Sequence, residues 1–324
     1  MSSRTTSSFL VLAALAAALA ACRREDESSP ESKASPAPSA RAKETTPAPP
    51  TPELLYLPDG YDPTRPTQPA APARRVCPAE MVSVGGAFCI DRFEVSLVDG
   101  ASLRELSPHY PPSRRSVISL QERFARIPVR EPAWGQLIPL PAPPSFQLNE
   151  DFTPRAVSRE AAIPSGYLSR LTARAACENA GKRLCSRDEW VRACRGEANR
   201  DHPYGADYQA GACNVHRHSH PARLLHGDAS KNHLDPRLGL AMDDEGPLLR
   251  RTGATARCRS DWGDDAAFDM VGNLDEWIED PEGTFLGGFY SRATTAGCSA
   301  AIELHGPDYL DYSLGTRCCR QVDP

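Results

Sequence analysis

Ten of the eleven cysteines in this 324-residue chain lie after residue 76, and their even number is the feature that most limits how the chain can fold. An even set of cysteines in an exported chain is typical of a disulfide framework. No two of them have the Cys-x-x-Cys spacing that favours zinc. The cysteines therefore predict a disulfide-linked globular domain over residues 76–324, and they leave Cys22 for a separate role.

The first 21 residues are similar to the signal peptide of a bacterial lipoprotein. Arg4 precedes an apolar stretch from Phe9 to Ala20, which is too short to span a bilayer comfortably. Small residues then precede Cys22, as in a lipobox, where the chain is cut before the cysteine and its thiol is acylated. Several acyl chains on Cys22 would anchor the protein stably in a membrane. The alternative is an ordinary secretory signal with a chance cysteine.

The residue after Cys22 is Arg23 rather than aspartate. By resemblance to enteric sorting rules, this favours the outer membrane over the inner membrane. The predicted location is therefore the cell envelope of a bacterium, with the membrane itself as the first partner.

Residues 22–75 are rich in Pro, Ala, Ser, Thr and charged side chains. Such a segment buries too little apolar area to offset the entropy of ordering, and its prolines favour an extended spacer. We expect a disordered tether between the membrane and the domain. Residues 54–57 (Leu-Leu-Tyr-Leu) form a small apolar island within it, either a docking motif or a transient local cluster.

Composition excludes several classes of protein. The formal charge of −5 argues against a dedicated nucleic-acid binder. Mean hydropathy is −0.46, which excludes a polytopic membrane protein. No heptad or fixed-period repeat occurs, so coiled coils and solenoids are excluded as well. The sequence also shows no Ser-His-Asp elbow, phosphate-binding loop or paired catalytic carboxylates.

Few long elements are expected in the globular part. Residues 81–84 and 87–90 predict two short strands around a glycine turn, with residues 91–95 continuing the second strand. A short helix is expected near residues 120–124. Many prolines between residues 97 and 160 predict long loops.

The clearest helical signals come later in the chain. Ser169 is a candidate N-cap, and Gly181 fits the end of the helix that follows it. Ser186 and Glu189 match a capping box that begins a second helix, which Gly196 closes. Together these patterns predict a loop-rich α+β domain.

Several short motifs follow one another between residues 77 and 320. They are MV…EV at 81–95, AGKRLCSRDEW at 180–190, HPYG at 202–205, CN at 213–214, DMVGNLDEW at 269–277, GGFY at 287–290 and GTRC at 315–318. In this order they resemble the signatures of the formylglycine-generating enzyme (sulfatase-modifying factor) family, such as GKRLPTEAEWE and DMVGNVWEW. The resemblance implies that family's variant of the C-type-lectin-like fold, a compact and irregular α+β domain.

Oxidases of that family convert a sulfatase cysteine to formylglycine with O₂ and a copper(I) ion held by two cysteines in a GGSY-x-C…C segment. Soft thiolates suit copper(I). Here Arg292 stands at the position of the first cysteine, and Cys298 is one residue out of register with the second. Copper is therefore not expected. The resemblance predicts a catalytically degenerate module that binds or assembles an envelope protein or glycan.

Two other functions stay open. One is an oxidoreductase of the formylglycine-generating class that uses copper or another metal, with Cys298 or the histidines of His216-x-His218-x-His220 at its centre. The interpretation we prefer for the histidine run is an exposed insertion loop, because a linear run of histidines rarely closes a tetrahedral site. The other is a glycan-binding module, by analogy of fold alone.

The resemblance also implies disulfides between Cys194 and Cys298 and between Cys177 and one member of the vicinal pair 318–319. Nearness in the predicted hairpin suggests Cys77–Cys89. The set of pairs we adopt is Cys77–Cys89, Cys177–Cys318, Cys185–Cys319, Cys194–Cys298 and Cys213–Cys258. A redox-active bond between the vicinal cysteines is the alternative.

In the family, a Gly-Asn-x-x-Glu stretch supplies an asparagine oxygen, a backbone carbonyl and a carboxylate to a structural calcium ion. Hard oxygens on an irregular loop are what Ca²⁺ prefers. The resemblance assigns these roles to Asn273, Leu274 and Glu276, and a second calcium site to Asn214 and the Val215 carbonyl. The alternative is that these residues only tie loops together through hydrogen bonds.

Overall fold

The computed structural model describes residues 77–130 and 137–323. The predicted signal peptide (1–21), the lipobox Cys22 and the tether (22–75) lie outside these residues and stay predictions. Among the described residues, no helix has both the length and the apolar character that a membrane crossing requires.

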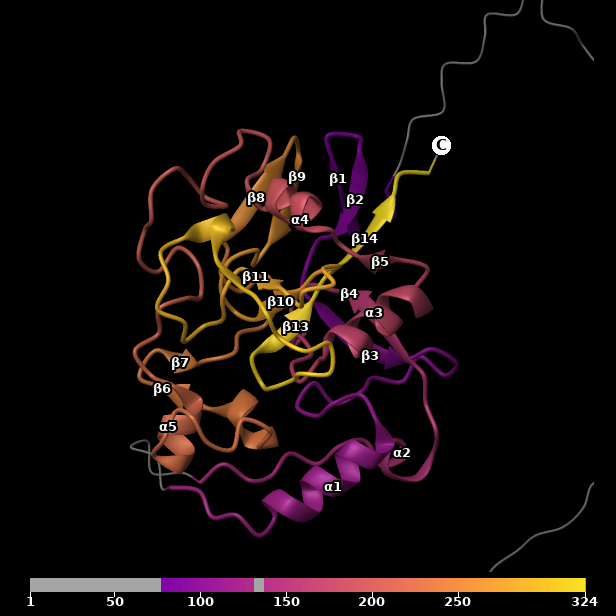
Figure 1. Cartoon of the computed structure of the whole chain (residues 1–324), viewed down its shortest axis with the longest axis vertical. Helices are drawn as coiled ribbons and strands as arrows, with labels where there is room; N and C mark the ends of the chain where they lie inside the picture. The colour runs from indigo at the N-terminus through magenta and orange to yellow at the C-terminus, as the bar shows by residue number, and fades with distance from the viewer. Residues whose placement is uncertain (1–76, 131–136, 324) are drawn as a thin grey trace, which may run out of the picture. The chain divides into compact units, whose positions relative to one another are not determined.

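Two four-stranded sheets organise the domain (Figure 1). In the first sheet the order is β1 (Met81–Val84), β2 (Phe88–Asp91), β14 (Cys318–Gln321) and β5 (Arg183–Leu184). In the second it is β12 (Ala301–Ile302), β11 (Phe285–Leu286), β10 (Asp275–Trp277) and β13 (Leu314–Thr316). β10 and β13 pair in parallel, and the other pairs are antiparallel. The first hairpin and the last strand of the described domain therefore lie side by side in the first sheet, where β2 pairs with β14.

Three two-stranded sheets complete the strands. They are β3 (Val95–Asp99) with β4 (Pro154–Ser158), β6 (Met242–Asp243) with β7 (Gly246–Pro247), and β8 (Arg259–Trp262) with β9 (Asp265–Phe268).

The expected continuation of the second strand to residue 95 is wrong. The strand β2 ends at Asp91, whose carboxylate accepts hydrogen bonds from the Cys318 amide and from Lys182. Two residues later the Phe93 amide donates to the Ser158 hydroxyl of β4. The chain therefore leaves one sheet and enters another over three residues, because both ends of this stretch are held by partners distant in sequence.

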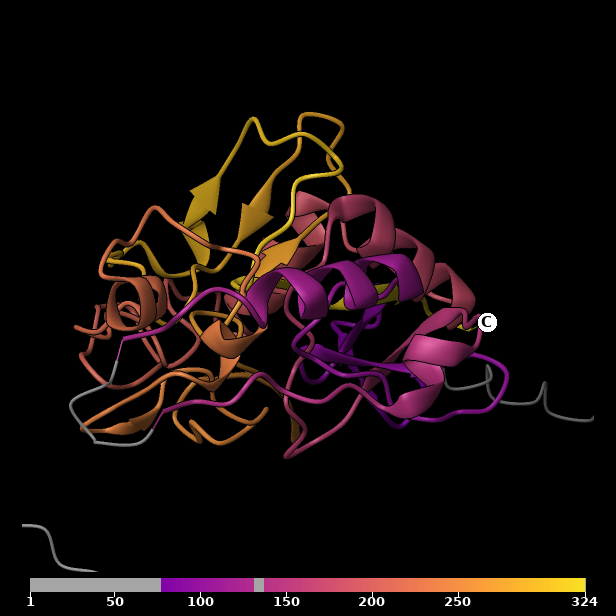
Figure 2. The same ribbon diagram turned by 90° about the horizontal axis from the view of Figure 1, so that it is seen from below.

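The two helices with strong signals form as expected. The helix α3 (Arg170–Asn179) begins at a capping box between Ser169 and Thr172, and α4 (Arg187–Cys194) begins at one between Ser186 and Glu189. The helix α1 (Arg114–Phe124) is longer than the predicted short helix. The remaining helical segments are α2 (Ser145–Asn149), α5 (Pro221–His226), η1 (Pro236–Leu240) and η2 (Gly297–Ser299). The helix α1 lies at the lower edge of the domain in Figure 1 and across its front in Figure 2, which is seen from below.

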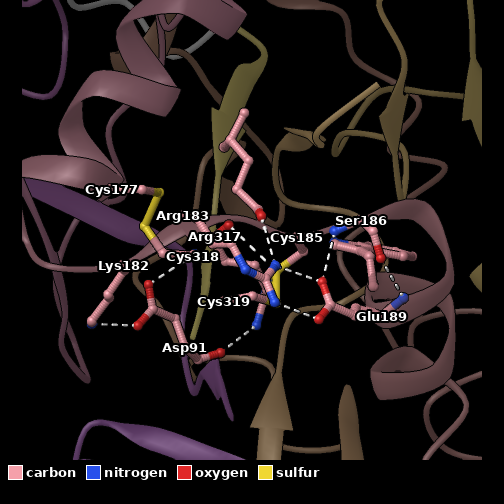
Figure 3. The surroundings of a disulfide bond; sticks show 12 residues. Asp91, Cys177, Lys182, Arg183, Cys185, Ser186, Glu189, Arg317, Cys318 and Cys319 are labelled. Atoms are coloured by element: carbon pink, nitrogen blue, oxygen red, sulfur yellow. Dashed lines mark hydrogen bonds and ion pairs between the residues drawn. A yellow bond between two sulfur atoms is a disulfide. The ribbon is translucent and has the colours of Figure 1, made fainter. Parts of the chain in front are cut away.

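Five disulfides join these elements, and they are the five pairs adopted from the sequence. Adjacent residues of a strand point to opposite faces. Cys318 therefore packs with Cys177 in one hydrophobic core, while Cys319 packs with Cys185 in another. Figure 3 shows both bridges leaving the same strand. The vicinal cysteines are thus not bonded to each other. Each forms a disulfide in a different hydrophobic core, on opposite faces of the same strand.

Candidate functional site

The segment between β11 and β12 carries the positions at which the family holds copper. Cys298 lies in η2, is fully buried and is bonded to Cys194 at the end of α4. The Cα atoms of the two cysteines are 5.6 Å apart. A sulfur atom in a disulfide carries no thiolate, so Cys298 has no ligand to offer copper(I) in this state.

Arg292 occupies the other position and is paired with Asp275, the first residue of β10. The Asp275 side chain is 1% exposed, and that of Arg292 is 26% exposed. The guanidinium also lies 5.3 Å from the centre of the Phe289 ring, within the range of a cation–π contact. Burial raises the pKa of Asp275 to about 7, although the Arg292 guanidinium acts to lower it.

Aromatic and acidic side chains surround this ion pair. The Asp311 carboxylate accepts hydrogen bonds from the Tyr309 hydroxyl at 2.9 Å and from the Ser313 amide at 2.8 Å. The rings of Phe289 and Tyr290 lie edge to face, 5.3 Å apart. Burial and the nearby Asp311 charge raise the pKa of Tyr309, so its hydroxyl stays protonated and donates its hydrogen bond. An ion pair surrounded by aromatic side chains thus occupies the position at which the family binds copper(I).

Glu276, a candidate calcium ligand, lies on the neighbouring position of β10 and faces Arg317. Both side chains are fully buried, and the shortest of their nitrogen–oxygen distances is 2.7 Å. The indole Nε1 of Trp190 donates to the same carboxylate at 2.6 Å. Both oxygens of Glu276 are therefore used by protein donors.

Asn273 is held in the same way. Its backbone has the left-handed φ of 61°, and its Oδ1 accepts hydrogen bonds from the Asn214 side chain at 3.0 Å and from the Arg250 amide at 2.9 Å. Its Nδ2 donates to Glu94 at 2.6 Å, and the Leu274 amide donates to the same carboxylate at 2.9 Å. These contacts match the alternative in which the motif ties loops together.

A second buried carboxyl lies near Glu94. Burial raises the pKa of Asp269 to about 6, against the effect of the hydrogen bond it accepts from the Gly253 amide at 2.6 Å. Burial, together with the charges of Asp269 and Glu276, also holds the pKa of Glu94 well above its ordinary value. The buried Arg317 cation thus lies among three buried acidic groups, Glu94, Asp269 and Glu276.

The second candidate calcium site, at Asn214, differs from the first in its hydrogen bonding. Its Nδ2 donates to the Leu248 carbonyl at 2.8 Å, but its buried Oδ1 has no hydrogen-bond partner among the described residues. One free amide oxygen beside Val215 is compatible with a cation. The carboxylate of Asp243, which could serve as the acidic ligand of such a site, is paired with Arg217.

The histidine run does not converge on one point. His218 is exposed, whereas His220 accepts or donates a hydrogen bond at 3.1 Å with the Tyr312 hydroxyl, and His216 packs against the Tyr208 ring at 5.5 Å. Across the described ranges, no group of three or more His, Cys, Asp or Glu side chains is placed to hold a metal ion. Two of the three histidines are half-buried, so the expected exposed loop is only partly correct.

A family model settles what kind of domain this is. The model of the sulfatase-modifying factor enzyme 1-like domain matches residues 39–321. This chain belongs to the sulfatase-modifying factor enzyme 1-like domain family. The membership confirms the expected α+β fold class, the formylglycine-generating-enzyme-like variant of the C-type-lectin-like fold. The match begins within the segment that the sequence predicts to be a tether.

Solved structures give weaker similarities. CarF is 15% identical over 73% of this chain and 87% of its own, with a TM-score of 0.34. PvdO from Pseudomonas aeruginosa is 12% identical over 72% of this chain and 80% of its own, also with a TM-score of 0.34. The Major Tropism Determinant I1 variant has a TM-score of 0.39 and 12% identity over 76% of this chain, which spans about half (53%) of that protein. A search of the curated proteins gave no match.

Set beside the family motifs, the site contains a residue that the sequence analysis missed. Asp275 stands where the signature DMVGNVWEW has its tryptophan, and Arg292 stands where the family has its first copper cysteine. The structure shows that these two departures contact each other. The signal was present in the motif comparison, because Asp275 replaces the first tryptophan of the signature.

The residues present do not fit copper(I), since one thiol is absent and the other is oxidised. They do not fit calcium at Asn273 and Glu276 either, because protein donors use the side-chain oxygens of both residues. Among the described candidate side chains, only Asn214 has an oxygen without a hydrogen-bond partner. Calcium at the second site therefore stays a prediction.

Proposed function

We propose that this chain is a non-oxidising member of the sulfatase-modifying factor enzyme 1-like family, held at a bacterial membrane by a lipid on Cys22. Its domain serves as a binding or assembly module for a protein or glycan of the cell envelope. The observation that carries the proposal is the disulfide between Cys298 and Cys194, which leaves Cys298 without a thiolate to bind copper(I).

The ion pair supports the same conclusion. A copper(I) site needs soft ligands that bind the metal and leave room for the substrate thiol. The Arg292 guanidinium is permanently charged and repels a cation, and its pairing with Asp275 keeps it in place. Arg292 and the disulfide-bonded Cys298 thus stand in place of both copper ligands, which favours retention of the fold without the oxidase chemistry.

The decisive experiment is an assay of formylglycine formation. The purified protein is incubated with a sulfatase-type Cys-x-Pro-x-Arg peptide, copper and a reductant, and the peptide mass is followed. We expect no conversion by the wild type or by Arg292→Cys, because Cys298 stays bonded to Cys194. An active oxidase of the family is the positive control.

Copper-dependent conversion by the wild type would overturn the proposal and restore the oxidoreductase alternative. Glycan-array binding in the presence and absence of calcium then distinguishes a glycan ligand from a protein ligand. We expect retention on a glycan only if the partner is a carbohydrate, and a calcium requirement would point to Asn214 and Val215.

A further inference from the structure

The helix α1 and the loop that follows it carry a strong positive charge in an acidic protein. Residues 113–130 contain five arginines and one acidic residue, Glu122, whereas the whole chain has a net charge of −5. All five arginines are exposed. Positive charge concentrated in one element is the electrostatic footprint of an anionic partner.

Three of the arginines form a stripe on the outer side of α1. Arg115, Ser119 and Arg123 are spaced four residues apart and so share a face, which Arg126 continues beyond the end of the helix. The opposite face buries Val117, Leu120 and Phe124. The stripe therefore points away from the core, and Figure 1 shows α1 at the lower edge of the domain.

No carboxylate in the described ranges pairs with the stripe. The ion pair of this helix joins Arg114, outside the stripe, to Asp151 at 3.8 Å. The acidic groups near the stripe are Glu122 on the helix and Asp308 on the C-terminal loop, fewer than the arginines. Like charges held side by side oppose folding slightly, so this arrangement favours a role in binding rather than in stability.

A cavity adjoins the stripe between α1 and the C-terminal loop. Its volume is about 480 Å³. Arg115, Ser116 and Ser119 lie on its α1 side, while Leu234 and Leu310 contribute apolar walls. A guanidinium with two hydroxyls suits a phosphate group, and leucine walls suit a hydrocarbon chain beneath it.

We propose that the arginine stripe of α1 and this cavity bind the headgroups of an anionic phospholipid bilayer. Arginines near an anionic surface each strengthen attachment, and the phosphate of one lipid enters the cavity beside Arg115. The lipid on Cys22 would keep the domain close to such a surface.

The test uses the full mature chain with Cys22→Ala, so that no acyl chain contributes. Sedimentation is measured with vesicles of phosphatidylcholine alone and with about 30% phosphatidylglycerol added. We expect binding only to the anionic vesicles, and weaker binding at high salt. The triple variant Arg115→Ser, Arg123→Ser, Arg126→Ser should bind about a hundredfold more weakly.

A matched triple variant controls for overall charge. Arg200, Arg251 and Arg257 are exposed outside α1, and their replacement by serine should leave vesicle binding within about twofold. The single variant Ser119→Asp should weaken binding about tenfold, because its charge repels the phosphate beside Arg115. Thermal melting checks that every variant is folded.

Three results would overturn the proposal. One is unchanged binding by the α1 variant, and another is an equal loss in the control variant, which would show that only net charge matters. The third is displacement from vesicles by millimolar inorganic phosphate, which would indicate a site for a free anion instead of a membrane surface. None of these outcomes bears on the formylglycine assay, so the two proposals fail separately.

Discussion

The ion pair between Arg292 and Asp275 should contribute to stability only where Asp275 is ionised. In the folded protein, burial holds the pKa of Asp275 at about 7. In the unfolded chain the carboxyl ionises near its ordinary pKa of about 4. The folded state therefore keeps a proton that the unfolded state has lost, and stability falls as the pH rises through this window. Asp275→Asn should remove that part of the fall.

The magnitude follows from the same pKa. Without Arg292 the pKa of Asp275 would rise further, because the guanidinium is the group that lowers it. Above pH 7 the Asp275 carboxyl ionises in the folded wild type but not in the folded Arg292→Met variant. The difference between their free energies of unfolding therefore grows by about 1.4 kcal/mol per pH unit. The coupling between the two residues should thus be near zero at about pH 5.5 and about 2 kcal/mol at about pH 8.5.

The assay is a double-mutant cycle by urea unfolding with the disulfides intact. Arg292→Met, Asp275→Asn and the double variant are compared with the wild type at the two pH values. The exposed pair of Arg104 and Glu150, 2.6 Å apart, is the control and should show little coupling at either pH. A coupling that is equal at both pH values, or larger in acid, would refute the reasoning.

Three further predictions concern the disulfides, the anchor and the calcium motif. Loss of the Cys177 or the Cys185 bridge alone should cost about 2.6 kcal/mol of unfolding free energy, because the lost bridge closes a loop of only about nine residues while the other bridge is intact. Loss of both bridges should cost about 6 kcal/mol by urea unfolding. Titration of the denatured, unreduced protein should find no free thiol from residue 77 onward, and four or more would contradict the framework. Cys22→Ala should move the protein from the membrane to the soluble fraction in a high-salt wash, which also weakens binding through the α1 arginines; retention through the apolar segment in that wash would disprove the lipobox. Glu276→Gln should cost about 3–5 kcal/mol equally with and without EDTA, because Arg317 loses its partner and no metal is involved; a larger cost without EDTA would restore calcium.

Local signals in the sequence determined several elements. The capping boxes at Ser169 and Ser186 were predicted because their partners lie three residues away in the chain. The hairpin of β1 and β2 followed from two short apolar stretches on either side of two glycines. Adjacent residues of a strand face opposite ways, so the vicinal cysteines at 318 and 319 could serve two bridges whatever the rest of the fold. The family resemblance supplied the fold class that these short signals could not.

Tertiary structure decided the chemistry of the site. Asp275 and Arg292 are 17 residues apart, and only the pairing of β10 with its neighbours brings their charges together. Glu276 could have served calcium as far as its motif shows, but it pairs with Arg317, which lies between β13 and β14, 41 residues later in the chain. The end of β2 at Asp91 likewise depends on an amide of β14. The charge, burial and partners of these groups depend on contacts between distant segments, for which no local pattern exists in the sequence.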